Sequence, residues 1–267
     1  MALIDLHAHI LPAMDDGSPD METSLDMARV AVADGIVVMA CTPLVMPGIY
    51  QPTAHEIEMS YAGFQLRLQE AGIPLDVVAG CEAHSRPDFI QALTGGQIPT
   101  LNNSRYVLYD PPRMVAPPRL EEMLYAMLDE DYVPILTSPE NLKWIESHFE
   151  VVQRLVERGV WLQLTAGSLS GRQGRQSQYW AERLLEEGMV HILASDAHNL
   201  VSRPPILSEA YELARVAVGT DEALNLVCTR PVNILDDEPA DNSPSVAYNA
   251  RRAKEPHWLW PRYQNAS

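Results

Sequence analysis

The chain has 267 residues, 46% of them apolar, which is enough to bury a substantial core. Its 36 Asp and Glu against 19 Lys and Arg give a formal charge of −17. This negative excess argues against binding to nucleic acid or to an anionic membrane. It also means that an anionic substrate would be repelled unless the protein supplies positive charge locally.

The elements expected from hydrophobic patterning alternate along the chain: short runs rich in Val, Ile and Leu precede longer amphipathic stretches. The expected strands are residues 2–6, 36–41, 75–79, 105–109, 133–137, 160–164 and 190–194. The expected helices lie near 20–34, 53–71, 86–94, 117–130, 140–158, 176–187, 205–218 and 220–227. Ser18 is placed to cap the first helix and Gly35 to end it. About seven β–α units in series favour a parallel sheet or barrel, which spacing alone does not distinguish.

The C-terminal segment 236–267 differs in composition from the rest of the chain. It is rich in Asp, Pro, Asn and Ser, and then carries a basic patch and two tryptophans: Arg251, Arg252, Lys254, Trp258 and Trp260. We expect one domain over residues 1–235 followed by a flexible tail. No signal peptide, membrane-spanning run or disulfide framework is visible, so the sequence predicts a cytoplasmic protein without membrane insertion.

Metal-ligating side chains follow several of the expected strands. They are His7, His9, Glu82, His84, Asp110, Asp196 and His198. Because the carboxyl ends of parallel strands meet on one face, these residues should converge there. His7 and His9 are two residues apart, so an extended chain points both to the same side. Imidazole and carboxylate together suit Zn, Mn or Fe, and the pattern predicts a metal site. His84 can be a ligand or merely a neighbour of one.

Other phosphate-handling and nucleophilic motifs are missing from the sequence. No GxGxxG or GxxxxGK[ST] loop occurs, and Gly167–Gly171 does not have the register of a GxSxG elbow. A cysteine phosphatase places Arg six residues after its nucleophile, whereas Cys41, Cys81 and Cys228 have Pro47, Pro87 and Ile234 there. The sequence therefore lacks the signature motifs of these four classes.

Four ordered segments carry a resemblance to a known family. They are IDLHAHILPAMDDGSPD at 4–20, TAGSLSG at 165–171, ILASDAHN at 192–199, and Arg203-Pro204-Pro205. Over about residues 1–235 the chain resembles the capsule-type bacterial protein tyrosine phosphatases of the polymerase and histidinol phosphatase (PHP) superfamily. The resemblance implies a distorted (β/α)7 TIM-like barrel with up to three metals, usually manganese. It also implies hydrolysis of phosphotyrosine, typically on a bacterial tyrosine kinase of exopolysaccharide or capsule synthesis.

The resemblance also implies ligands for each metal. The first would be held by His7, His9, Glu82 and Asp196, all of which are present. The second would share Glu82 with Asp110 and a His of an HPER-like motif, but this chain has Ser138-Pro-Glu-Asn141 there. The third would use Asp16, His198 and the His of a TPH motif, where this chain has Leu44. One site is thus complete, and we expect the other two to be weakened.

The remaining charged residues suggest roles but leave three functions open. Arg203 is the best candidate for a phosphate clamp, because a guanidinium binds phosphate oxygens in bidentate fashion. Asp16 can be a metal ligand or a general acid for the leaving phenolate. The chain can be a tyrosine phosphatase with a reduced metal complement, or a weakened member that binds its kinase partner as a regulator. It can also be a PHP phosphatase of a small phosphorylated metabolite. An oligomer is compatible with each of these.

Overall fold

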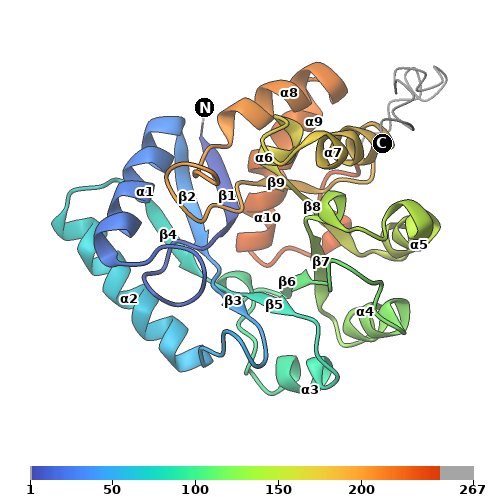
Figure 1. Cartoon of the computed structure of the whole chain (residues 1–267), viewed down its shortest axis with the longest axis horizontal. Coiled ribbons are helices and arrows are strands. Elements are labelled where there is room, and N and C mark those ends of the chain that lie inside the picture. The colour runs from blue at the N-terminus through green and yellow to red at the C-terminus, as the bar shows by residue number, and fades with distance from the viewer. Residues whose placement is uncertain (1, 247–267) are drawn as a thin grey trace, which may run out of the picture.

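The strands of the computed structural model, which describes residues 2–246, form a parallel barrel surrounded by helices (Figure 1). The strands are β1 (Leu3–Ala8), β2 (Ile36–Cys41), β3 (Leu44–Val45), β4 (Asp76–Ala79), β5 (Glu82–His84), β6 (Tyr106–Asp110), β7 (Val133–Thr137), β8 (Trp161–Thr165) and β9 (Ile192–Ala194). One sheet has the order β1-β2-β4 and the other β3-β5-β6-β7-β8-β9. All pairs in both sheets are parallel.

The two sheets are parts of one seven-stranded barrel. Strands β2 and β3 are separated by Thr42-Pro43, and β4 and β5 by Gly80-Cys81. Proline has no N–H for the ladder and so interrupts pairing at the first break. Because β2 pairs with β4 and β3 with β5, each broken pair continues the same two strand positions. A bridge between Ala8 and Ala197 joins β1 to the segment after β9. The expected distorted (β/α)7 barrel is confirmed, and the two breaks are its distortion.

Helices surround the barrel, and one of them, α10, lies behind its centre in the view of Figure 1. They are α1 (Met21–Asp34), α2 (Ala54–Glu70), α3 (Phe89–Thr94), α4 (Leu120–Asp129), α5 (Phe149–Arg158), α6 (Ala166–Leu169), α7 (Arg175–Glu186), α8 (Ser208–Val218), α9 (Thr220–Leu224) and α10 (Arg230–Leu235). Shorter turns occur at Leu101–Asn103, Pro139–Asn141, Glu146–His148 and Ala240–Asn242, and a π-helical turn at Asn225–Thr229. Figure 1 shows α1 and α2 beside β2 and β4, and α4, α5 and α7 beside β7 and β8.

Two helix predictions need correction. The first helix is capped by Asp20, whose side chain accepts a hydrogen bond from the Thr23 N–H at 2.8 Å, and not by Ser18. Gly35 ends this helix with φ 96, as expected. The helix expected over 140–158 forms only from residue 149, because the preceding segment turns inward. Trp144 is buried there, and its indole N–H donates to the Pro112 carbonyl at 2.9 Å.

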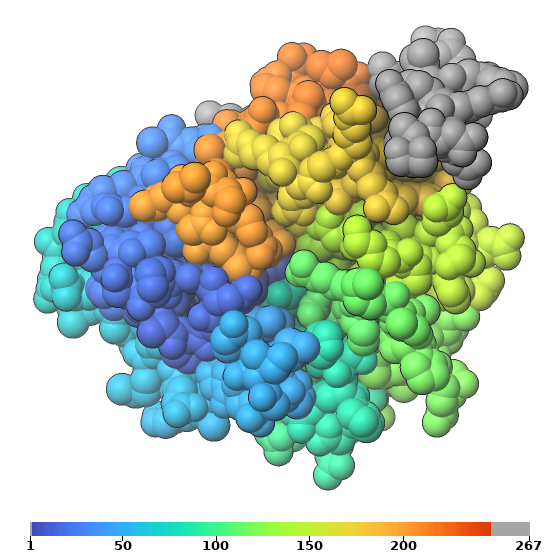
Figure 2. Space-filling model, in the orientation of Figure 1, coloured from blue at the N-terminus to red at the C-terminus, as the bar shows by residue number. Residues whose placement is uncertain are grey.

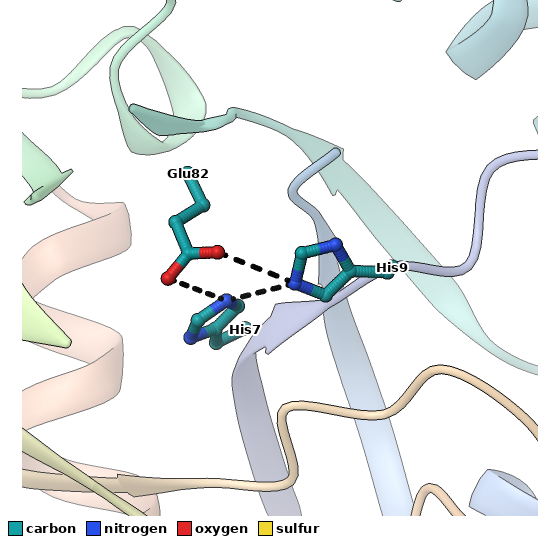
Figure 3. Close-up of side chains that lie close together, drawn as sticks. All are labelled: His7, His9 and Glu82. Carbon is teal, nitrogen blue, oxygen red and sulfur yellow. Dashed lines mark hydrogen bonds and ion pairs between the residues drawn. The ribbon is translucent and has the colours of Figure 1, made fainter. Parts of the chain in front are cut away.

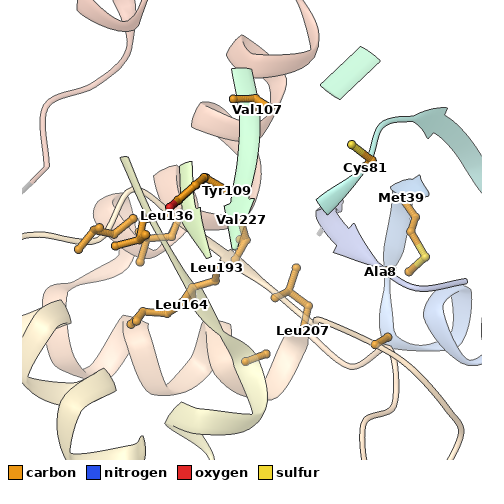
Figure 4. Packing of buried hydrophobic residues seen from close by; sticks show 14 of the residues in the cluster. Ala8, Met39, Cys81, Val107, Tyr109, Leu136, Leu164, Leu193, Leu207 and Val227 are labelled. Atoms are coloured by element: carbon orange, nitrogen blue, oxygen red, sulfur yellow. The ribbon is translucent and has the colours of Figure 1, made fainter. Parts of the chain in front are cut away.

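The alternation along the strands separates the apolar core into two layers. Val107, Leu136 and Leu164 belong to the larger cluster, shown in part in Figure 4, which packs under the helices. Leu108 and Ile135, one residue away, belong to a smaller cluster on the opposite face of the strands. Successive side chains of a strand point to opposite faces, so this smaller cluster fills the barrel interior.

On the interior face, side chains change from apolar to polar toward the carboxyl ends of the strands. Every second residue of a strand faces the interior. The interior residues, in order along each strand, are Leu108 then Asp110; Ile135 then Thr137; Trp161, Gln163 then Thr165; and Ile192, Ala194 then Asp196. The apolar lower layer holds the barrel together, and the polar layer above it faces the side on which parallel barrels place their active sites.

The folded structure continues past residue 235, where the sequence predicts a flexible tail. Asp237 accepts hydrogen bonds from the backbone and side chain of Arg105, and the Tyr106 hydroxyl donates to the Glu238 carbonyl. Arg230 donates to the carbonyls of Pro244 and Ser245. The basic residues and tryptophans expected in the tail lie outside the described residues. Within residues 2–246, no helix has both the length and the hydropathy needed to cross a bilayer.

Candidate metal centre

Four buried side chains converge at the end of β1, the start of β5 and the segment just after β9. The Nε2 atoms of His7 and His9 lie 3.2 Å apart. Glu82 places one oxygen 3.5 Å from each of these nitrogens, as Figure 3 shows. Asp196 Oδ1 lies 3.6 Å from His7 Nε2 and 3.4 Å from His9 Nε2. The register of β1 against β2 shifts between Asp5 and Ala8, the interval that contains His7.

The outer nitrogens of the two imidazoles are bound by acceptors. The Gln163 side-chain oxygen lies 2.7 Å from His7 Nδ1, and an Asp15 carboxylate oxygen lies 2.7 Å from His9 Nδ1. Both Nδ1 atoms therefore donate a proton, which leaves a lone pair on each Nε2. Two such lone pairs 3.2 Å apart, facing two carboxylates, repel one another unless a cation lies between them. The donor set thus fits a divalent metal.

The spacing of the donor atoms supports the same conclusion. Ligand atoms bound about 2.0–2.2 Å from one tetrahedral ion lie roughly 3.3–3.6 Å from each other, and the distances above fall close to that range. In the metal-free protein, positive charge between the carboxylates comes from protonation of the histidines. Burial opposes a charge on His9, but hydrogen bonds to Asp15 and Asp196 outweigh burial and raise its pKa to about 10. Burial likewise opposes a charge on Glu82, yet the charges of His7 and His9 lower its pKa to about 2.

Asp16 and His198 lie beside this set. The His198 ring packs 3.8 Å from that of His9, measured between centroids, and its Nε2 lies 3.7 Å from Asp16 Oδ1. Burial, followed by the charge of His9, lowers the pKa of His198 to about 3, so its imidazole is neutral. Leu44 contributes only its backbone N–H, which donates to Asp15 at 2.6 Å. The third expected ligand position therefore has two donors and no side-chain ligand from Leu44.

Asp110 lies at the end of β6 and pairs with His84, whose Nδ1 is 2.6 Å from its Oδ2. Burial, and then the charge of Glu82, raises the pKa of Asp110. Ser138, where the resemblance expects a His, has a left-handed backbone at φ 47 and pairs its hydroxyl with Thr165 at 2.6 Å. Within residues 2–246, Asp110 belongs to no group of three donors that could hold a metal.

Arg203 contacts the metal-ligand candidate Asp196 directly. Its Nη2 lies 2.5 Å from Asp196 Oδ2, the oxygen that does not face His7 and His9. This contact fixes the carboxylate so that Oδ1 points to the two histidines. The arginine side chain is a quarter exposed, and its Nε is buried without a hydrogen-bond partner. The sequence predicted that Arg203 binds the phosphate of the substrate. The structure adds its contact with Asp196.

Several supporting residues were missed by the sequence analysis. Gln163 is a polar residue within the apolar run Trp161–Thr165, which is a detectable but weak signal. Asp15 precedes the expected ligand Asp16 and was not assigned a function. Gly17 allows this loop to return to the strand, because a Cβ at that position would lie 2.1 Å from the His9 carbonyl oxygen.

Glu140 is another residue whose role the sequence did not reveal, and it is only 1% exposed. It accepts hydrogen bonds from the Thr165 N–H and the Ser168 hydroxyl, and burial raises its pKa to about 7. Ser168 lies in the Gly- and Ser-rich segment 167–171, and the Glu140 contacts with Thr165 and Ser168 tie that segment to the end of β8. Asn141, where the resemblance expects Arg, donates to Gln173 at 2.7 Å.

Comparison with known proteins gives consistent relatives. The family described as "Capsular polysaccharide synthesis, CpsB/CapC" matches residues 3–236. The tyrosine-protein phosphatase YwqE of Bacillus subtilis is 34% identical over 219 residues, covering 82% of this chain and 86% of its own. The tyrosine-protein phosphatase CpsB of Streptococcus pneumoniae is 26% identical over 241 residues, covering 88% of this chain and 99% of its own.

Solved structures agree with these relatives. A structure from a study of YwqE of Bacillus subtilis and CpsB of Streptococcus pneumoniae, titled as unique metal-dependent tyrosine phosphatases, has a TM-score of 0.85 and 33% identity. It covers 88% of this chain and 95% of that one. Histidinol phosphate phosphatase of Lactococcus lactis matches with a TM-score of 0.52 and 14% identity, covering 81% of this chain and 94% of that one. The second likeness shows a shared fold alone.

Proposed function

The chain belongs to the CpsB/CapC family of capsular polysaccharide synthesis, and we propose that it is a metal-dependent phosphatase that hydrolyses phosphotyrosine in a partner protein. A bacterial tyrosine kinase of capsule or exopolysaccharide synthesis is the first candidate for that partner. The observation that carries the proposal is the convergence of two imidazole lone pairs and two carboxylates, each imidazole held in the required tautomer by an acceptor on its Nδ1.

The proposed metal ligands are His7, His9, Glu82 and Asp196. Manganese is the first candidate for the metal, with Zn or Fe as alternatives that the same donor set accepts. When bound, a divalent metal lowers the pKa of a water toward 7 and neutralises charge on a phosphoryl group. That cation also supplies the local positive charge that an acidic protein needs in order to bind an anionic substrate.

The other residues around the centre orient the ligands and the substrate. Gln163 and Asp15 hold the imidazoles so that Nε2 faces inward. Arg203 holds Asp196 through Nη2, and the N–H groups of its guanidinium that do not bind Asp196 are the candidate donors to phosphate oxygens. Asp16, whose side chain is about half exposed, lies at the opening, where it can protonate the leaving phenolate.

We propose one strong metal position. The resemblance implies a second metal at Glu82 and Asp110 and a third at Asp16 and His198, but Leu44 and Ser138 remove one imidazole from each. Loss of a direct ligand weakens a divalent site severely, since loss of a residue that only orients a ligand already costs about 10–100-fold in affinity. A regulator that binds its phosphorylated partner with little turnover is therefore the second candidate, and these two substitutions favour it.

Metal content and turnover distinguish the candidates. We would determine bound manganese by elemental analysis, and hydrolysis of p-nitrophenyl phosphate, a phosphotyrosine peptide and a small sugar phosphate. The Leu44→His/Ser138→His variant is the comparison, and histidine tolerates the left-handed backbone at position 138. The proposal expects about one metal and measurable peptide hydrolysis in the natural chain, with more metal in the variant.

Each other outcome has a distinct meaning. A natural chain that binds phosphotyrosine peptide but hydrolyses nothing, beside an active variant, indicates the regulator. Preferential hydrolysis of the sugar phosphate indicates a phosphatase of small metabolites. If the natural chain binds no divalent metal with His7, His9, Glu82 and Asp196 intact, the proposed metal centre is wrong.

A further inference from the structure

Three loops follow strands at the carboxyl end of the barrel, on the same side as the metal centre. We call them the rim loops: residues 46–52 after β3, 111–119 after β6, and 199–206 after the segment that follows β9. Figure 2 shows them in blue, green and orange around a hollow near the centre of the face in view. Any polypeptide that reaches the centre from this side passes over them.

The rim loops concentrate exposed apolar side chains. Five of the twelve large hydrophobic residues exposed within residues 2–246 lie on them: Ile49 (62%), Met114 (73%), Val115 (69%), Leu200 (40%) and Val201 (88%). The three loops make up only about a tenth of the described chain, so this share is several times that expected from an even distribution. Apolar side chains grouped around an opening are typical of a surface that binds another protein segment.

Each rim loop is braced so that its apolar residues are held in place. The Asn199 side-chain oxygen accepts from the backbone N–H groups of Val201 and Arg203, which fixes the turn that carries Val201. Met46 and Tyr50 exchange backbone hydrogen bonds of 2.7 and 2.9 Å around Ile49.

The remaining rim loop, residues 111–119, is tied near its start. The Arg113 carbonyl accepts from the Lys143 N–H at 2.9 Å, one residue before the exposed Met114. Pro112, just before it, accepts from the indole of Trp144. A surface fixed in this way loses little conformational entropy when it binds.

The charge of the rim loops is opposite to that of the whole protein. They contain no Asp or Glu, and their charged residues are Arg113, Arg119 and Arg203, in a chain of net charge −17. Arg119 is paired with Glu122 and Arg203 with Asp196. Arg113 is exposed. This surface is complementary to a segment with acidic and apolar side chains.

We propose that the rim loops are a docking surface for the polypeptide that carries the phosphorylated residue, and that they select segments in which that residue is flanked by apolar and acidic side chains. The inference rests on the proposed function for the reacting group, and adds to it the substrate class and the residues that choose it. Apolar side chains of the substrate pack on Ile49, Val115 and Val201, while its carboxylates lie near Arg113.

The test uses the full chain with Mn²⁺ and two phosphotyrosine peptides of equal length, one with Leu and Glu around the phosphotyrosine and one with Ser and Lys. The Ile49→Ser/Val115→Ser/Val201→Ser variant removes apolar contact from the rim loops. The matched control is Met59→Ser/Val216→Ser, because these residues are 61% and 68% exposed but lie on α2 and α8. Fluorescence anisotropy gives Kd for each peptide, and kcat/KM is measured for the peptides and for p-nitrophenyl phosphate.

The rim variant should bind the Leu/Glu peptide about tenfold more weakly, because partial loss of three apolar contacts has about this effect. Its kcat/KM for p-nitrophenyl phosphate should stay within twofold of wild type, and the control should match wild type throughout. Arg113→Glu should weaken binding of the Leu/Glu peptide and strengthen binding of the Ser/Lys peptide.

Equal Kd values for the two peptides in the natural chain, or equal losses in the rim and control variants, would overturn the docking surface. Because Kd is measured separately from kcat/KM, this result is distinguishable from failure of the proposed activity. A chain that hydrolyses no substrate but still prefers the Leu/Glu peptide through its rim loops would contradict the phosphatase and retain the docking surface.

Discussion

Asp15→Asn tests whether the residues behind the histidines determine metal affinity. Asp15 Oδ2 accepts from His9 Nδ1 at 2.7 Å and from the Leu44 N–H at 2.6 Å, and its Oδ1 accepts from the Gly17 N–H at 2.9 Å. Every partner of this carboxylate is a donor. Asparagine has almost the same shape but replaces one acceptor oxygen with an NH2 group, so one donor must face another donor.

The orientation of the amide sets the size of the effect. If the NH2 group faces Gly17, the partly buried N–H of Gly17 loses its acceptor, which costs about 1 kcal/mol of folding free energy. His9 then keeps its tautomer but faces a neutral acceptor, and metal affinity should fall about 10–100-fold. If the NH2 group instead faces His9, the imidazole must move its proton to Nε2 and loses its lone pair toward the metal. The first orientation therefore gives the smaller of the two losses.

Two assays measure these quantities for Asp15→Asn. Titration calorimetry of the metal-free protein with Mn²⁺ gives the Kd, and urea unfolding with chelator gives the folding free energy without metal. Asp26→Asn is the control, because the Asp26 side chain is about half exposed on α1 and pairs with Arg29 at the surface. A Kd for Asp15→Asn within twofold of wild type would refute the reasoning, as would equal losses in both variants.

Three further predictions concern other buried groups. Gln163→Met removes the acceptor from His7 Nδ1 and should raise the Kd for Mn²⁺ about 10–100-fold in the same titration. Burial, and then the charge of Arg230, lowers the pKa of His191 to about 3. The folded protein therefore favours the neutral imidazole, and its contribution to stability is complete only above pH 6.5, the pKa of this histidine in the unfolded chain. As pH falls from 6.5 toward 3, wild type should lose up to about 1.4 kcal/mol per pH unit relative to His191→Gln in urea unfolding. A difference that stays constant with pH would contradict this. Arg230→Met leaves Glu222 charged, buried and unpaired, and should cost about 3–5 kcal/mol by urea unfolding, partly recovered by adding Glu222→Gln.

The local pattern of the sequence determined most of the barrel. Each strand and its helix are contiguous in the chain, so hydrophobic periodicity and helix-ending glycines such as Gly35 predict their approximate limits. The breaks that separate β2 from β3 and β4 from β5 escaped prediction. They depend on pairing between strands distant in sequence, and a segment of two or three residues has no readable period.

The convergence of the proposed metal ligands was also predictable, because strand ends in a parallel sheet or barrel share one face whatever the loops do. His7 and His9 lie at one such end, and Glu82 and Asp196 at two others. Their convergence needed only the order of elements along the chain.

Only the tertiary structure decided which atoms of these residues face inward. The partners that set the tautomers lie in other segments: Gln163 is 156 residues from His7, and Asp15 reaches the backbone of Leu44. Arg203 contacts Asp196 because the turn around Asn199 brings it back to the site. A hydrogen bond between distant residues leaves no periodic signal, because each partner is also an ordinary residue of its own segment. The sequence thus determined the alternating strands and helices and the donor types, while folding decided the direction of each lone pair.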